Sequence, residues 1–485
     1  MGVGPIGEGV SGDSGVGEGD LGAAVPGLRV TVPYTGRACP AAATGRSGQR
    51  RGRLRHGAED GVAVSGTVSR VRTMLGGLRK RTAPMLKSPA VLSLGARAVF
   101  VDAPRLRGAR KSGASTGRAI LIAPPGAGNI GDAALVGAFL ENVAGPITVI
   151  TRYPGDIRIP ADQADRVEIV SLGTLLYGGL PSFVRDLRRF RAMLPGAASV
   201  SIVGADIMDG AYNFRASTSR AVVARSAASA GVDTRVLGFS WNGKAHPAAL
   251  SQLREADRAG ATLFLRDPLS VERARRDGLD AQASADIVFS ARSIDSQRAQ
   301  TELDALDTAG GVAIVNVSGL IDTDQTGAYV EIIGGLRERG FAIVLLPHVI
   351  KNGPDDLAAC RKVYAALPDT AQVAFVEDVL TPAEVRGFTE RATVTVTGRM
   401  HLAIMSLMKG VPAITLATQG KVEGLMAMFE LPYLCVEPGA GLAGRVGDAL
   451  ERVLSDREAV SAAIRAKLPA VQELSAANFR GLPRA

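Results

Sequence analysis

From residue 118 onward, short aliphatic runs alternate with longer amphipathic segments, and no other feature constrains the fold as strongly. Continuous runs of Val, Ile, Leu and Ala are typical of strands buried in parallel sheets. Strands that alternate with helical segments indicate βαβ units. The first six such runs lie at 118–124, 146–151, 167–172, 199–204, 234–239 and 261–266. The pattern therefore predicts an α/β protein with helices between parallel strands.

A polar stretch at 293–311 separates these runs from a second set. The second six runs lie at 312–317, 341–347, 372–376, 392–396, 412–417 and 433–436. We predict two doubly wound, Rossmann-like domains at 118–292 and 309–467, followed by a C-terminal tail at 468–485. Two such domains facing each other would form a cleft, and ligands of such sheets bind beyond the carboxyl ends of the strands.

Residues 1–117 differ in composition from the rest of the chain. They are rich in Gly, Ser, Ala and Arg without a sustained apolar period, which predicts a disordered basic leader. An alternative is that translation starts at Met74. Residues 1–118 hold 19 Lys and Arg against 7 Asp and Glu, so −3 of the total charge of +9 falls on residues 119–485. A nucleic-acid partner is therefore not expected for the globular part.

Cysteine content and hydropathy predict the compartment. The three cysteines show no metal-ligand spacing, and a sparse, odd set fits a reducing cytoplasm. We find no uncharged apolar run of about 18 residues, the length of a membrane span. The first twenty residues lack the basic start and apolar region of a signal peptide. We expect a cytoplasmic protein whose leader is solvated or, alternatively, contacts an anionic membrane at its inner face or an anionic polymer.

A glycine-rich turn follows the first predicted strand. Residues 126–131 have the dinucleotide-binding spacing G-x-G-x-x-G. Asp132 would oppose a pyrophosphate at the helix N-terminus, although Arg152, after the next strand, would suit the 2′-phosphate of NADP. Alternatively, Asn129 and Asp132 cap the helix. A third interpretation is a pocket for a polar ligand.

Charged side chains follow two more strands of the first set. Asp206 and Asp209 could bind sugar hydroxyls or serve as acid and base, or Asp206 could cap a helix. The Asp–Pro pair at 267–268 is a typical helix start. That leaves Arg266 unexplained, and its position suits an anionic ligand and a partner carboxylate about equally.

His348 follows a strand of the second set, with two aspartates at 355–356 in the loop after it. A histidine there is more often a surface or hydrogen-bonded structural residue. The nearby carboxylates keep a functional role open.

The segment 397–412, TGRMHLAIMSLMKGVP, carries the most informative pair. Arg399 and His401 begin a helix that is too apolar to be anything but buried. A helix N-terminus favours anions, and an arginine adds a bidentate fork for carboxylate or phosphate. Lys421 begins the next helix on the same rim. Together these groups predict a site for a small anion with more than one charge, although a surface arginine and a core histidine remain the alternative.

Five motifs in this order resemble the polysaccharide pyruvyl transferase family. They are GNIGDAAL at 128–135, GADIMDGAY at 204–212, FLRDPLSVERA at 264–274, LLPHV at 345–349 and the long block at 398–426. The resemblance implies a GT-B-like pair of Rossmann domains. It also implies transfer of pyruvate from phosphoenolpyruvate to sugar hydroxyls, with ketal formation and phosphate release, in polysaccharide or cell-envelope glycan biosynthesis.

The family motif carries over to Arg399 and His401, and its strand-end arginine to Arg266. We expect His401 to act as general acid, since the reference pKa of histidine is about 6.5, and the arginines and Lys421 to bind phosphoenolpyruvate. Asn129 and Asp132 would meet the acceptor sugar, or a lipid-linked glycan. Asp206 and His348 are further candidates for substrate binding. This chemistry requires no metal and no cofactor besides the donor substrate.

Three other functions are compatible with these residues. The first is a GT-B glycosyltransferase that uses a nucleotide sugar, because a fold does not fix a function. The second is an NADP-dependent oxidoreductase built on residues 126–131. The third is a regulator or scaffold without enzymatic activity that binds phosphorylated sugars.

Overall fold

The computed structural model describes residues 117–485 except 320–324, 351–354 and 418–419. The predicted leader, apart from Gly117, and the alternative start at Met74 lie outside the described residues. The predictions of disorder and of membrane contact for that segment therefore stay predictions. All described residues belong to one compact unit.

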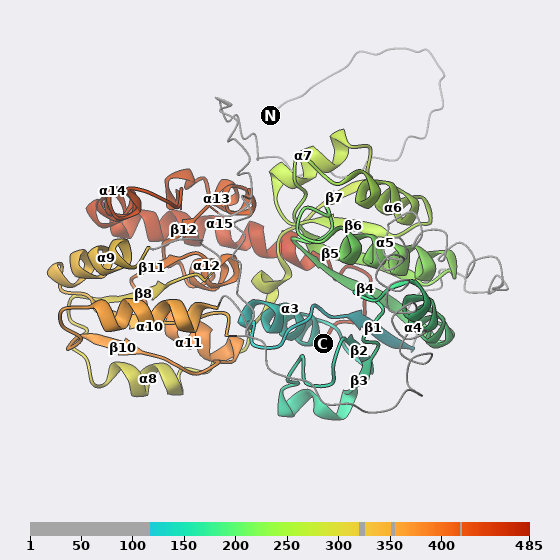
Figure 1. Ribbon diagram of the computed structural model, residues 1–485, viewed down its shortest axis with the longest axis horizontal. Coiled ribbons are helices and arrows are strands. Elements are labelled where there is room, and N and C mark those ends of the chain that lie inside the picture. Colours follow the sequence, from blue (N-terminus) through green and yellow to red (C-terminus); the bar gives the residue numbers. More distant parts are fainter. Residues whose placement is uncertain (1–116, 320–324, 351–354, 418–419) are drawn as a thin grey trace, which may run out of the picture. The chain divides into compact units, whose positions relative to one another are not determined.

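The first sheet has seven parallel strands in the order β3-β2-β1-β4-β5-β6-β7 (Figure 1). Six of them match the aliphatic runs predicted as strands. The seventh, β7, was missed because its three residues, Ala-Gln-Ala, form no aliphatic run. The strands are β1 Arg118–Ile122, β2 Ile147–Thr151, β3 Val167–Ser171, β4 Ala197–Ala205, β5 Asp233–Phe239, β6 Thr262–Leu265 and β7 Ala281–Ala283.

Helices connect these strands. They are α3 Ile130–Asn142, η2 Ala161–Arg166, α4 Leu180–Met193, α5 Phe214–Ser229, α6 Pro247–Arg258, α7 Pro268–Arg276 and η3 Ile287–Ser290. The predicted helix start at Asp267 and Pro268 is confirmed, because the Asp267 carboxylate accepts the Ser270 N–H and Pro268 is the first helical residue.

The second sheet has six parallel strands in the order β10-β9-β8-β11-β12-β13. All six were predicted. They are β8 Val312–Asn316, β9 Ala342–Leu345, β10 Val373–Phe375, β11 Val394–Thr397, β12 Ala413–Leu416 and β13 Cys435–Val436. The accompanying helices are α8 Gln297–Leu303, α9 Thr326–Glu338, α10 Asp356–Ala366, α11 Pro382–Arg391, α12 Met400–Leu407, α13 Lys421–Phe429, η4 Pro432–Leu434 and α14 Leu442–Ser455.

Both sheets reverse their strand order beside the first strand. In the first sheet β1 lies between β2 and β4, and in the second β8 lies between β9 and β11. Ligands of doubly wound sheets bind beyond the carboxyl ends of strands at such a switch point. The predicted fold class, an α/β protein with two doubly wound parallel sheets, is confirmed.

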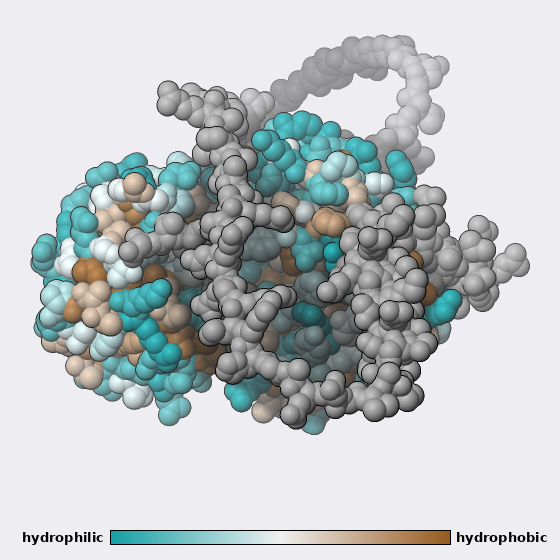
Figure 2. All heavy atoms as spheres, in the orientation of Figure 1, coloured by the Kyte–Doolittle hydropathy of each residue, from teal (hydrophilic) through white to brown (hydrophobic). Residues whose placement is uncertain are grey.

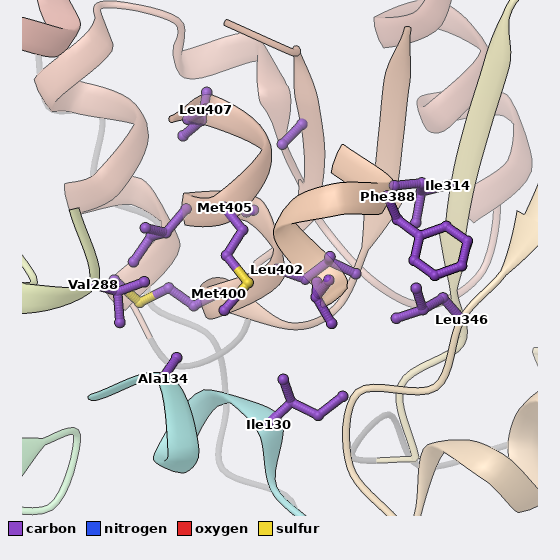
Figure 3. Packing of buried hydrophobic residues seen from close by; sticks show 14 of the residues in the cluster. Ile130, Ala134, Val288, Ile314, Leu346, Phe388, Met400, Leu402, Met405 and Leu407 are labelled. Carbon is purple, nitrogen blue, oxygen red and sulfur yellow. The ribbon is translucent and has the colours of Figure 1, made fainter. Parts of the chain in front are cut away.

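One large cluster of buried apolar side chains includes residues from both sheets. Helix α12 supplies Met400, Leu402 and Met405, and Figure 3 shows Ile130 and Ala134 of α3 pointing toward this helix. Because apolar burial is the main stabilising term in folding, this contact fixes α12 against the first sheet's helix as well as its own strands.

Helix α15, Arg457–Ala477, carries the chain back to the first sheet. The Asn478 side chain accepts the Gly238 N–H at 2.8 Å and donates to the Ala285 carbonyl at 3.0 Å. The Arg235 guanidinium donates to the Asn478 carbonyl. The segment predicted as a C-terminal tail therefore begins as part of a helix and is anchored on the first sheet, while the domain boundaries stay a prediction.

Large apolar side chains are rarely exposed on the described part of the chain. The four exposed ones are Tyr153, Tyr212, Ile294 and Val379. On the face shown in Figure 2, much of the coloured surface is hydrophilic, with hydrophobic residues in smaller patches. Among the described helices, none combines the length and the apolar character needed to cross a membrane.

Candidate active site

Arg399 and His401 lie where a strand ends and a buried helix begins, as predicted. Strand β11 is an alternation of Val and Thr, and all four residues are buried. Arg399 occupies the N-cap position of α12, and its backbone N–H donates to Thr397 Oγ1 at 2.9 Å. Every residue of α12 except His401 is buried. The apolar side chains thus hold the helix in place and leave the pair at its mouth.

Asp356 binds the Arg399 guanidinium. Arg399 Nε lies 3.1 and 3.0 Å from the two carboxylate oxygens, and the Arg399 side chain is 12% exposed. The carboxylate also accepts four other hydrogen bonds, from the N–H groups of Gly319, His348 and Val349 and from the Asn316 side chain. Burial would raise the pKa of Asp356, but Arg399 and these donors outweigh burial and hold that pKa below its ordinary value.

His401 lies beside a second buried carboxylate, Asp286. His401 Nε2 is 3.5 Å from Asp286 Oδ2, and among the described residues this nitrogen has no hydrogen-bond partner. Asp286 also accepts Arg266 Nη1 at 2.9 Å and the Val288 N–H at 3.0 Å. Burial opposes ionisation, yet His401 and Arg266 lower the pKa of Asp286 to about 2. One carboxylate therefore faces both the histidine of α12 and the arginine after β6.

Arg266 is fully buried, at 1% exposure. Its Nε donates to Ser240 Oγ at 2.8 Å, in addition to the ion pair with Asp286. Of the two partners that the sequence left open for Arg266, the structure shows a carboxylate. Sequence reasoning missed Asp286, which comes three residues after the unrecognised strand β7.

The N-terminus of α3 faces His401. Asn129 caps this helix, since its side chain accepts the N–H groups of Gly131 and Asp132. A Cβ atom on Gly131 would lie 2.3 Å from His401 Nδ1, so only glycine permits this approach. Burial raises the pKa of the Asp132 carboxyl to about 6, although the nearby His401 opposes this shift. The third glycine of the motif, Gly131, is therefore explained by its close packing against His401.

Lys421 and Asp206 form an ion pair between α13 and the loop after β4. Lys421 Nζ lies 2.7 Å from Asp206 Oδ2. Burial would raise the pKa of Asp206, but Lys421 and Arg266 outweigh burial and hold it well below its usual range. Asp206 does not cap a helix. Asp209, by contrast, accepts the Ala211 N–H of its own loop and the Asn242 N–H of the loop after β5.

His348 is buried rather than exposed, with 1% of its surface accessible. Within the described part of the chain, neither ring nitrogen has a hydrogen-bond partner. Burial lowers the pKa of His348 to about 3, and the neighbouring His401 and Arg399 act in the same direction, so the His348 ring is neutral. Its backbone joins two parts of the site, because the N–H donates to Asp356 and the carbonyl accepts the Ile130 N–H.

A cavity of about 320 Å³ adjoins the Lys421–Asp206 pair. Its lining includes Asp206, Tyr212, Trp241, Asn242, Arg273 and Lys421. Sequence reasoning did not select Tyr212 or Arg273. The usable signal was that both residues lie inside motifs quoted above: Tyr212 ends the motif at 204–212, and Arg273 lies in the motif at 264–274, whereas the other two arginines of α7 lie outside it.

The site thus combines cations with matched carboxylates. Arg266, Arg399 and Lys421 each pair with an aspartate, and His401 lies next to one. Such paired cations are held in fixed positions, and they can bind an anion by sharing their remaining N–H groups. A titratable histidine among them suits proton transfer near neutral pH.

The order and spacing of these groups agree with one protein family. A family model for polysaccharide pyruvyl transferases matches residues 129–420, more than half of the chain. The chain belongs to the polysaccharide pyruvyl transferase family. It is therefore a transferase, as predicted. The match contains Asn129, Asp206, Arg266, His348, Arg399, His401 and Asp286. No curated protein matches the chain in sequence.

Solved structures share its fold. A structure from Listeria monocytogenes assigned as a UDP-N-acetylglucosamine 2-epimerase matches with a TM-score of 0.50 and 12% identity, over 74% of this chain and 93% of that chain. The S. aureus MnaA structure with UDP matches with a TM-score of 0.50 and 10% identity, over 74% of this chain and 94% of that chain. The two parallel sheets of this pyruvyl transferase family member thus have a GT-B-like arrangement.

Proposed function

We propose that this family member transfers pyruvate from phosphoenolpyruvate to two hydroxyls of a sugar in the cytoplasm, during polysaccharide or cell-envelope glycan biosynthesis. The observation that supports this most is the position of His401. Its imidazole lies 3.5 Å from the buried Asp286 carboxylate, which also binds Arg266. A proton donor with a fixed counter-ion and a neighbouring guanidinium suits an anionic enol ester.

The chemistry starts with protonation of the donor's methylene carbon by the His401 imidazolium. A sugar hydroxyl adds to the adjacent carbon and loses its proton, the bond to the phosphate oxygen breaks, and a second hydroxyl completes the ketal. Of the two hydroxyl protons released, one restores His401 and the other leaves with phosphate. Asp286 stabilises the charged imidazole before the transfer.

Arg266, Arg399 and Lys421 would bind the donor's carboxylate and phosphate. Arg399 is held in orientation by Asp356, and Lys421 by Asp206. Preorganised cations stabilise charge on a leaving group without reorganising during the reaction. Asp132, beside His401, would face the acceptor. The steps require neither a metal ion nor a further cofactor.

The alternative function is that of a GT-B glycosyltransferase using a nucleotide sugar. The S. aureus structure of the same fold contains UDP. The paired cations of the site could hold a diphosphate instead of phosphoenolpyruvate. The two functions differ in which donor the cations bind.

Calorimetric titration separates them. Phosphoenolpyruvate should bind wild type saturably, with UDP-sugars and NADPH failing to displace it. His401→Ala should keep donor binding within about threefold and lose at least about 100-fold in phosphate release during an acceptor screen, the usual size of general acid catalysis. Arg399→Ala should lose donor binding.

Arg361→Ala is the matched control, because Arg361 is an exposed arginine paired only with Glu377. It should bind the donor normally, and a thermal melt of each variant checks folding. Binding of a UDP-sugar without phosphoenolpyruvate would assign the chain to the glycosyltransferases. Weak donor binding with normal turnover in His401→Ala would remove the acid role from this residue.

A further inference from the structure

We propose that the cavity beside the Lys421–Asp206 pair binds the acceptor as a sugar that carries a phosphate group, with Arg273 contacting the phosphate. This inference rests on the proposed pyruvyl transfer, for which it specifies the acceptor class. It assigns a role to Arg273, which lies on helix α7 and not at a strand end, unlike the charged residues selected from the sequence.

The cavity wall offers the groups that bind a sugar ring. Tyr212 is 50% exposed, one of few large apolar side chains that are accessible in the described chain, and it lines this cavity. An accessible aromatic face suits the C–H face of a pyranose. Asn242, Ser240 and Asp206 add amide, hydroxyl and carboxylate groups, which donate to and accept from hydroxyls.

Arg273 differs from the other cations of the site. Within the described residues, no ion pair of Arg273 is present, whereas Arg266, Arg399 and Lys421 each have one. Its one hydrogen bond is a long contact of 3.5 Å from Nη1 to the Trp241 carbonyl. An uncompensated guanidinium at a cavity wall suits a phosphate, which it can bind with two parallel hydrogen bonds.

Arg273 acts electrostatically on the buried carboxylate of Asp267, but the described part of the chain holds no ion pair between the two. Asp267 accepts the Ser270 N–H at 2.7 Å and the Ser270 hydroxyl at 2.6 Å. Burial raises the pKa of Asp267, although the nearby Arg273 opposes this shift. The two carboxylates of the cavity lining have other partners: Asp206 binds Lys421, and Asp209 accepts the Ala211 and Asn242 N–H groups. Arg273 therefore keeps donors for a ligand.

The cavity lies next to the residues proposed to bind phosphoenolpyruvate, but most of these residues do not line it. Arg399, His401 and His348 are not part of its lining, while Lys421 is. A volume of about 320 Å³ lies at the small end of ligand pockets, enough for a sugar phosphate. The geometry favours a donor beside His401 and an acceptor in the cavity, with Lys421 and Asp206 at their common edge.

The test is calorimetry on the full chain with four probes. UDP represents a nucleotide-linked acceptor, geranyl diphosphate a lipid-linked one, inorganic phosphate the free anion and methyl glucoside a neutral sugar. At least one diphosphate should bind wild type more tightly than phosphate or the glucoside. Arg273→Gln should weaken this binding about 10-fold or more, as expected for a charged hydrogen bond, and Arg273→Lys should restore part of it.

Arg276→Gln is the matched control, because Arg276 is an exposed arginine of the same helix outside the cavity lining. It should leave every affinity unchanged, and phosphoenolpyruvate should bind Arg273→Gln as it binds wild type. A preference for UDP or for geranyl diphosphate identifies the carrier of the sugar.

Three outcomes would overturn the inference. Both diphosphates bind Arg273→Gln as tightly as wild type, or Arg273→Gln loses phosphoenolpyruvate binding as strongly as it loses diphosphate binding. The third outcome is that wild type binds inorganic phosphate but neither diphosphate. Failure of the proposed function differs from all three. In that case wild type does not bind phosphoenolpyruvate, while diphosphate binding still depends on Arg273.

Discussion

Two buried arginine–aspartate pairs, one at each sheet, have the same chemistry and different surroundings. In the first, Asp286 binds Arg266 and also faces His401, which comes from the other sheet's helix α12. In the second, Asp356 binds Arg399 and accepts four further hydrogen bonds, all from residues of the second sheet's half. The two arginines are paired alike, so the remaining contacts of each carboxylate distinguish the pair beside His401 from the pair that holds Arg399 in a fixed orientation.

The largest expected effect tests the Asp356–Arg399 pair. Asp356→Ala leaves Arg399 without its counter-ion and several buried N–H groups without an acceptor. Breaking a buried pair by removing one partner costs about 3–5 kcal/mol. The free energy of unfolding in urea should fall by this amount.

Asp355→Ala is the neighbouring control, because Asp355 only caps α10 through the Ala358 N–H. Loss of a cap costs about 1 kcal/mol. If the free energy of unfolding falls by a similar amount in both variants, Asp356 does not stabilise residues beyond α10. The difference drawn between the two arginine–aspartate pairs would then be wrong.

The second prediction tests the Asp286–Arg266 pair beside His401. Asp286→Asn keeps the shape of the side chain and removes the charge beside His401. Transfer should fall about 10-fold to 100-fold, the effect of removing one opposite charge next to the proposed proton donor. Activity should also disappear at a lower pH than in wild type, because the imidazolium has lost its anionic neighbour.

A pH profile of phosphate release measures both effects. Asp156→Asn is the control, since Asp156 is a buried carboxylate of the same half that binds the Tyr153 N–H. If Asp286→Asn lowers the rate but leaves the pH profile unmoved, Asp286 supports the fold and does not stabilise charged His401.

The third and smallest effect concerns Asp132, a carboxyl beside His401 with no cation of its own bonded to it. Its pKa is raised from 3.8 to about 6 in the folded protein. The unfolded chain therefore releases this proton first, and stability falls as pH rises from about 4 to 6. A shift of this size corresponds to about 3 kcal/mol. Because the Asp132 residue is only partly buried and solvent screens its charge, we expect Asp132→Asn to stabilise the protein by about 1–2 kcal/mol at pH 8.

That gain should vanish below about pH 4, where the Asp132 carboxyl is protonated in both states. Urea unfolding of wild type and Asp132→Asn across pH 4–8 measures it. Asp165→Asn, at an exposed carboxylate of the same half, should give no comparable gain. A constant difference between Asp132→Asn and wild type at all pH values would contradict a titrating Asp132.

The fold could be predicted because nearly all of its strands appear in the sequence as short apolar runs. Buried parallel strands must be continuously apolar, and twelve of the thirteen described strands match such runs. The exception, β7, lies at the sheet edge with two exposed residues and needs no apolar run. The same gap concealed Asp286, since the strand end that positions it was not recognised.

The sequence by itself determined the two parallel sheets, the buried helix behind Arg399 and His401, and the family motifs that surround them. These follow from local periodicity and from residue order. Only the tertiary structure decided the partners: Asp286 for His401 and Arg266, Asp356 for Arg399, and Asp206 for Lys421. It also showed that Arg273 has no ion pair among the described residues. A charge's partner depends on which loops meet in space, and residues far apart in the chain, such as Asp206 and Lys421, give no local signal of their approach.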